Sequence, residues 1–153
     1  KCSRIVMFDH LSSDSKVWIY TADRNFTEED KIVVTDAMKQ FLPQWAAHGD
    51  SLYGDYAIEH DRFLILVVDE SQVGASGCSI DTSVRFIKNL GAQLNIDFFN
   101  RLNMIIEKDG NLDTVHISDL KNHLDSNVFN PMITKLSDLR ENWKIPVEAS
   151  PFV

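Results

Sequence analysis

Residues 53–69 read YGDYAIEHDRFLILVVD, and this stretch decides the fold. Residues 53–59 have the aromatic and aliphatic composition of a strand. Residues 62–69 contain a continuous apolar run, which is typical of a central strand covered on one face and partly on the other. The short gap at His60-Asp61 predicts that the two strands form a hairpin.

Strand and helix patterns alternate on either side of this hairpin. Residues 16–20 (KVWIY) predict a strand, and residues 27–48 predict an amphipathic helix that Thr27 caps and Gly49 ends. Pro43 should kink this helix or start a second short turn. After the hairpin, a Gly/Ser loop leads to a helix from Ser79 to about Asn89, and residues 102–107 predict a further strand.

The order from residue 16 to residue 107 is therefore strand, helix, strand, strand, helix, strand. It predicts an α+β fold, a ferredoxin-like split βαβ sandwich (βαββαβ) with two helices on one face of an antiparallel sheet. A turn at Lys108-Asp109-Gly110-Asn111 predicts an added C-terminal hairpin strand, which short helices follow. Another α+β layering of the same hairpins is the alternative. We expect residues 7–153 to form a single domain and residues 1–6 to be an extension or a cloning scar.

Composition excludes several classes of protein. The chain has 153 residues, 15 Lys+Arg against 23 Asp+Glu, a net charge of −8 and two cysteines. The excess of acid argues against nucleic-acid binding, because affinity for phosphates needs a basic face. Two cysteines make no disulfide framework, and no apolar run approaches the ~20 residues that span a bilayer. We therefore expect a cytoplasmic globular protein that binds neither membrane nor nucleic acid.

Two short stretches imitate the nucleotide-binding motifs of transporter ATPases. Residues 74–79 (GASGCS) resemble the start of a phosphate-binding loop, and residues 64–70 resemble an apolar strand that ends in Asp-Glu. The loop motif needs a lysine and then a magnesium-binding hydroxyl, whereas Ile80 and Asp81 follow here. An acid near the place of the cation argues against ATP hydrolysis.

Five further stretches carry a family resemblance: residues 17–20 (VWIY), 45–49 (WAAHG), 62–63 (RF), 77–81 (GCSID) and 97–101 (DFFNR). They resemble a family of small uncharacterised bacterial proteins, often labelled ABC transporter ATPases although they lack the Walker lysine. The resemblance runs from about Met7 to the C-terminus. It implies a cytosolic bacterial protein with no known activity and assigns no catalytic residue.

One candidate site lies at the predicted start of the second helix. Free backbone N–H groups and the helix dipole can activate the thiol of Cys78, and the topology can bring His48 close as a base. Asp81 opposes a thiolate there, and a lone cysteine is commonly a small buried hydrophobe, while His48 can simply complement a helix C-terminus. The residues expected to bind a ligand at this end are Trp45, Gly74, Gly77, Ser79 and Asp81.

A second candidate cluster lies at the opposite end of the predicted sheet. It consists of Arg24, Arg62, Asn100 and Arg101. Arginine forks bind carboxylates and phosphates, so these residues can form a cationic pocket. In an acidic chain, pairing of each arginine with a nearby acid such as Asp61 or Asp97 is the competing interpretation.

The absence of a complete catalytic motif favours a non-catalytic module that binds a small ligand or a protein partner, with a homodimer through an open sheet face as one form. The alternative is a thiol-dependent enzyme or redox protein that uses Cys78 and His48. The sequence has no metal-ligand spacing, since His116 and His123 stand seven residues apart without further ligands, and it predicts no cofactor.

Overall fold

The computed structural model describes residues 8, 11–47, 50–51, 53–69 and 77–153, with side chains for all of these except 46–47, 50–51, 53 and 77–79. The strands are β1 (Lys16–Thr21), β2 (Ala46–Ala47), β3 (Asp50–Ser51), β4 (Tyr53–Glu59), β5 (Phe63–Asp69), β6 (Asn103–Lys108), β7 (Asn111–His116), β8 (Asn127–Phe129) and β9 (Lys144–Pro146). The helices are α1 (Glu28–Phe41), α2 (Gly77–Leu94) and α3 (Leu136–Asn142), with 3-10 turns η1 (Leu42–Gln44), η2 (Ile117–Asn122) and η3 (Val147–Ala149).

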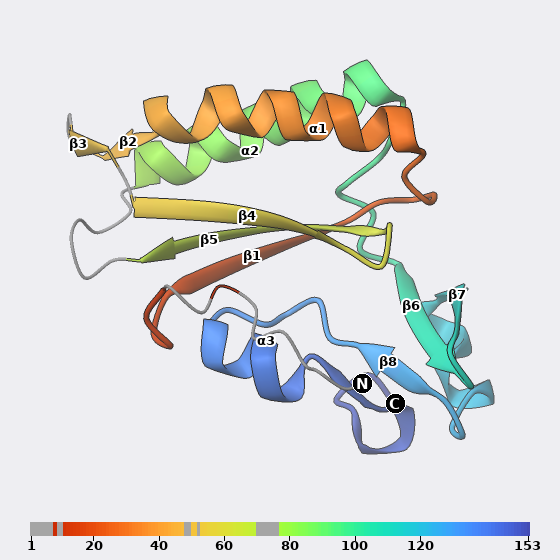
Figure 1. Ribbon diagram of the computed structural model, residues 1–153. Coiled ribbons are helices and arrows are strands. Elements are labelled where there is room, and N and C mark those ends of the chain that lie inside the picture. Colours follow the sequence, from red (N-terminus) through yellow and green to blue (C-terminus); the bar gives the residue numbers. More distant parts are fainter. Residues whose placement is uncertain (1–7, 9–10, 48–49, 52, 70–76) are drawn as a thin grey trace.

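The predicted hairpin pairs β4 with β5, and β5 is the central strand of an antiparallel sheet in the order β1-β5-β4 (Figure 1). Every residue of β5 is buried, which explains its unbroken apolar sequence: both of its faces are covered. Helices α1 and α2 cover one face, where Val34 and Met38 of α1 and Ile87 of α2 pack against the apolar side chains of the sheet.

Helix α1 begins as the sequence predicts. The Thr27 hydroxyl accepts the Asp30 N–H at 3.0 Å and the Asp30 carboxylate accepts the Thr27 N–H at 2.8 Å, which together make a capping box. The helix is shorter than predicted, because the second short turn that Pro43 predicts is present as η1, with Pro43 as its second residue, and the chain is then extended at β2. Gly49 lies outside the described residues.

Helix α2 is longer than predicted, since it continues through Gly91 to Leu94. The chain then folds back, and the Ile96 N–H donates to the Gly91 carbonyl at 2.9 Å. A Cβ at Gly91 would stand 2.5 Å from the Ile96 carbonyl oxygen, so the close return needs glycine.

A second antiparallel sheet has the order β7-β6-β8-β9. The fold is therefore α+β, and β7 is the predicted hairpin partner of β6. The complete ferredoxin-like sandwich is not confirmed, because β6 pairs with β7 and β8 rather than with β1. The outer edge of β1 is instead bridged by Lys135, and the Val17 N–H donates to the Thr134 carbonyl at 3.0 Å.

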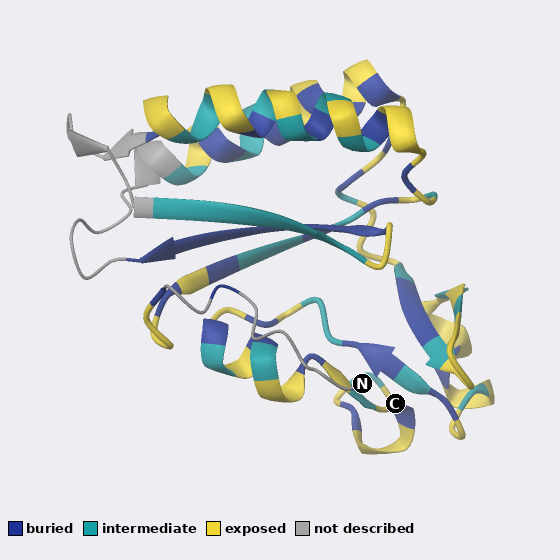
Figure 2. Cartoon of the chain, in the orientation of Figure 1, coloured by how far each residue is buried: buried dark blue, intermediate teal, exposed yellow. Residues whose placement is uncertain are grey.

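The C-terminal half covers the other face of the first sheet. Phe63, Ile65 and Val67 of β5 pack there against Phe129 of β8 and Leu136 of α3, so the first sheet is sandwiched between two layers. Figure 2 shows the resulting line of buried residues along β5. The helices within the described ranges are each too short or too polar to span a membrane.

Candidate functional site

A polar cleft of about 470 Å³ lies where the β4–β5 turn meets the β6–β7 hairpin, at the junction of the two sheets. We call it the Arg62 cleft. Its lining residues are Asn25, His60, Asp61, Arg62, Gly110, Asn111, Leu112, Asp113 and Thr114. The volume falls within the range of small-ligand sites.

The β4–β5 turn fixes one wall of the cleft. His60 and Asp61 have φ angles of 54° and 55°, so both occupy the left-handed region that a type I′ hairpin turn requires. The N–H groups of Phe26 and Ala22 donate to the carbonyls of Asp61 and Arg62, each at 2.7 Å. The turn is therefore tied to the segment before α1, and Arg62 enters β5 in a fixed place.

Arg62 is a buried cation, with only 8% of its surface exposed. Its Nε and Nη2 donate to the Ala22 carbonyl at 3.3 and 3.1 Å, and Nη2 also donates to the Thr114 hydroxyl at 2.8 Å. Within the described part of the chain, no carboxylate pairs with this guanidinium. Burial lowers the pKa of Arg62, and the charge of Asp23 opposes that shift.

Two hydrogen-bond donors remain available at this point. Nη1 of Arg62 has no partner among the described atoms and is not one of the sealed polar atoms, which are Ser15 Oγ and Trp143 Nε1. Nη1 is therefore exposed to solvent, and Arg62 is one of the residues that line the cleft. The Thr114 hydroxyl accepts from Arg62 and still has its own hydrogen to donate. A cationic N–H and a hydroxyl thus meet at the end of β5.

The β6–β7 hairpin fixes the other wall. Asp109 and Gly110 have φ angles of 54° and 84°, which again makes a type I′ turn. The Glu107 carboxylate accepts the Gly110 N–H at 2.7 Å and the Asn127 side-chain amide at 3.2 Å, which holds the turn against β8. These bonds lower the pKa of Glu107, the Gly110 N–H most of all.

His60 joins the cleft to an aromatic cluster beneath it. The His60 ring centroid lies 5.0 Å from that of Phe129, 5.7 Å from Trp143 and 6.3 Å from Phe63. Burial and, after it, the charge of Lys144 lower the pKa of His60, so the ring favours its neutral form. The positive charge at the base of the cleft therefore belongs to Arg62.

Acids in the lining differ in how they are paired. Asp61 accepts from Lys31 Nζ at 2.7 Å, so its charge is compensated at the rim. Asp113 is exposed on β7 and has no ion-pair partner among the described residues. The cleft therefore combines one buried cation with negative charge at its edge.

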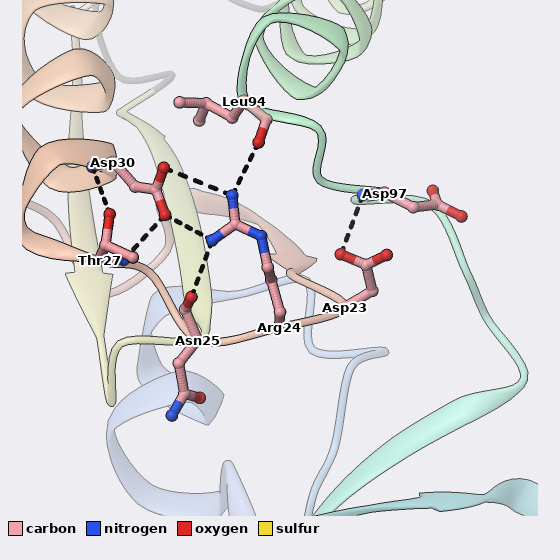
Figure 3. Close-up of polar contacts among 7 residues, drawn as sticks. All are labelled: Asp23, Arg24, Asn25, Thr27, Asp30, Leu94 and Asp97. Atoms are coloured by element: carbon pink, nitrogen blue, oxygen red, sulfur yellow. Dashed lines mark hydrogen bonds and ion pairs between the residues drawn. The ribbon is translucent and has the colours of Figure 1, made fainter.

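Arg24, predicted to belong to the same cluster, is used by the fold. Figure 3 shows its guanidinium between α1 and α2: Nη1 donates to Asp30 at 2.6 Å and Nη2 to the Leu94 carbonyl at 2.7 Å. The hydrogen bond from Arg24 is the largest cause that lowers the pKa of Asp30 to about 2. The prediction that arginines pair with nearby acids thus holds for Arg24, with Asp30 rather than Asp61 or Asp97 as the partner.

The other two members of that cluster lie outside the cleft lining. Asn100 is exposed, and its side chain accepts the Leu102 N–H at 2.9 Å. Arg101 is also exposed, and its charge acts on Tyr20, whose pKa is raised by burial of the hydroxyl. Arg62 is the member of the predicted set that lines the cleft.

The predicted thiol site falls largely outside what the structure describes. His48 and Gly74 are not described, and of Gly77, Cys78 and Ser79 only the backbone is described, as the first residues of α2. The backbone is helical at this place, in agreement with the predicted second helix. The pairing of Cys78 with His48 stays a prediction.

Trp45 and Asp81, also predicted to bind a ligand there, are described. Trp45 is 2% exposed in the core, with its ring centroid 5.4 Å from that of Phe41 and 6.2 Å from that of Trp18. Asp81 is exposed on α2. Their part in ligand binding stays a prediction.

Comparison with family models, with curated proteins and with solved structures gave no match to the chain. Among the described side chains, no group of three His, Cys, Asp or Glu is placed to hold a metal ion.

Sequence reasoning missed Thr114, Asn111 and Asn25 as members of the site. The turn at residues 108–111 is plain in the sequence, but nothing local shows that its hairpin packs against Arg62. Arg62, the charged residue directly before the apolar run of β5, was predicted, but its sequence neighbours do not indicate which residues pack against it.

Proposed function

We propose that this protein is a non-catalytic module that binds a small anionic ligand in the Arg62 cleft. The observation that carries the proposal is a guanidinium that is 8% exposed, lines a cleft and pairs with no carboxylate among the described residues. The scaffold is a split βαβ unit of the ferredoxin-like kind, to which a second sheet adds one wall of the site.

Burial of an unpaired charge is unfavourable for the fold. Removal of an ion from water costs several kcal/mol, and a nearby opposite charge normally offsets that loss. The Ala22 carbonyl and the Thr114 hydroxyl satisfy N–H groups of Arg62, but both are neutral. An anion in the cleft would supply the missing charge, and this is how arginine binds carboxylates and phosphates elsewhere.

The remaining donors support binding rather than chemistry. The Thr114 hydroxyl contacts the Arg62 guanidinium rather than an imidazole, and His60 is packed against aromatic rings. A hydroxyl that hydrogen-bonds a guanidinium is not activated as a nucleophile, because activation needs an adjacent base. The Arg62 guanidinium and the Thr114 hydroxyl instead suit a bound oxyanion, because both can donate hydrogen bonds to it.

The test is a titration with sodium acetate and with sodium phosphate, followed in ¹H–¹⁵N NMR spectra at constant ionic strength. We expect saturable shifts at residues 59–62 and 110–114. Arg62→Gln should abolish them, and Arg101→Gln, which removes an exposed arginine outside the cleft, should leave them intact. Thr114→Val is a second variant in case Arg62→Gln does not fold, and it should weaken binding. The proposal is wrong if neither anion gives saturable shifts, or if the Arg62 and Arg101 variants respond alike.

A further inference from the structure

We infer that the ligand is the C-terminal end of an extended peptide, whose carboxylate binds Arg62 and whose backbone pairs with the open edge of β7. The inference rests on the proposed function and names the class of ligand. It follows from the position of Arg62 at one end of an unpaired strand edge.

The backbone N–H and C=O groups of successive β7 residues point alternately toward β6 and toward the open edge of the sheet. The two-residue turn at Asp109 and Gly110 makes Lys108 and Asn111 a hydrogen-bonded pair, since the turn itself is closed by that bond. Bonded and non-bonded pairs alternate in an antiparallel ladder, so Leu112 and Thr114 stand in non-bonded pairs. Their N–H and C=O groups therefore point away from β6.

No neighbouring strand uses these groups. β7 is the end strand of its sheet, and among the described residues no backbone hydrogen bond outside the β6–β7 ladder involves Leu112 or Thr114. Both residues line the Arg62 cleft. An open edge of this kind is a template to which an extended peptide adds as a further strand.

The Arg62 guanidinium lies near the end of β7 at which the C-terminus of the added strand would be placed. Arg62 Nη2 donates to the Thr114 hydroxyl, so the free Nη1 and the free hydroxyl hydrogen lie beside the Thr114 end of the edge. The cleft lining continues from there along β7 to Asn111 and on to Gly110 in the turn. At about 3.4 Å per residue, the four strand positions 111–114 match about four residues of an extended chain. A carboxylate at Thr114 thus leaves the preceding residues to run along β7 toward the turn.

The charges favour a carboxylate over a phosphate. The cleft offers one guanidinium, while His60 favours its neutral form and Asp61 and Asp113 line the rim. A phosphate dianion would bring two negative charges to one cation in a protein of net charge −8. A chain terminus brings a single charge that one guanidinium balances.

The experiment is a calorimetric titration with two probes, N-acetyl-tetra-alanine with a free C-terminal carboxylate and the same peptide with a C-terminal amide. We expect the acid to bind more tightly than acetate and roughly ten- to a hundredfold more tightly than the amide, the range of one charged hydrogen bond. Arg62→Gln should remove that difference, and Arg101→Gln should keep it.

Peptides methylated in turn at each amide nitrogen test the strand pairing. We expect loss of affinity at alternate positions, because every second N–H of an added strand faces β7. In ¹H–¹⁵N spectra of the complex, the amides of Leu112 and Thr114 should become protected from exchange, while that of Asp113 stays unchanged.

The outcomes separate the two proposals. If acetate or phosphate binds in an Arg62-dependent way but the peptide acid binds no more tightly than acetate, the peptide inference is wrong and the proposed function stands. Equal affinity of acid and amide, or methylation effects without alternation, also overturns the inference. If no anion binds, both proposals are wrong.

Discussion

Replacement of Asp30 by asparagine should destabilise the fold in a pH-dependent way. Asp30 is 8% exposed, accepts the Thr27 N–H and pairs with Arg24. Its pKa of about 2 compares with an ordinary value of 3.8. At about 1.4 kcal/mol per unit, the charged form contributes about 2 kcal/mol to the free energy of unfolding at neutral pH. Asparagine keeps an oxygen for the cap but carries no charge, so Asp30→Asn should lose most of this.

The sign of the pH dependence follows from the lowered pKa. The contribution of Asp30 is fully present above the unfolded value of 3.8 and is lost as the pH falls toward 2, with about half remaining at pH 3. The difference between the wild type and Asp30→Asn should therefore shrink over this window. It should stay constant between pH 5 and pH 8.

Glu29→Gln is the matched control. Glu29 is exposed in the same first turn of α1, so both substitutions remove one negative charge from the helix N-terminus. Urea unfolding followed by tryptophan fluorescence should shift the midpoint by about 1 M for Asp30→Asn and by a few tenths for the control. Equal shifts in the two variants, or an Asp30→Asn difference that is the same at pH 7 and pH 3, would refute the reasoning.

Two further predictions concern the close return of the chain at Gly91 and the β4–β5 turn at His60. Gly91→Ala should lower the free energy of unfolding by about 2 kcal/mol or more in thermal denaturation, despite the better helix propensity of alanine, because the new Cβ meets the Ile96 carbonyl at 2.5 Å. Gly110→Ala, which has φ +84° but open space around it, should cost only about 1 kcal/mol, and a larger loss there than at Gly91 contradicts the packing argument. His60→Asn should remove part of the acid sensitivity of the fold: the lowered pKa of His60 means that stability falls as the pH drops below 6.5, with Lys144 adding to that loss and Asp61 and Glu107 opposing it. Unfolding free energies measured from pH 7.5 to pH 5 should fall less steeply for the variant, which also suits the left-handed φ, and equal slopes would show that His60 does not titrate as inferred.

The sequence predicts those parts of the fold whose causes are local. The hairpin at residues 53–69 follows from an apolar run next to a short turn, and the start of α1 follows from Thr27 and Asp30 as a reciprocal cap. The choice of sheet that β6 joins is not determined by its local sequence. Ile105 packs beneath the first sheet while Met104 and Ile106 pack in another cluster, so the strand is apolar on both faces and its sequence fits either sheet.

The candidate site shows the same limit at the level of single residues. Arg24 and Arg62 each stand beside an aspartate in the sequence, and both fit a cationic pocket or an ion pair equally well. The two are separated by what the fold brings to them: Arg24 meets the cap carboxylate of Asp30, whereas Arg62 meets the neutral Ala22 carbonyl and the Thr114 hydroxyl. Thr114 comes from a hairpin 52 residues away. A charge that the fold leaves unbalanced can be recognised only after the partners are placed, and this is why Arg62 and not Arg24 is the residue on which the proposed ligand binding depends.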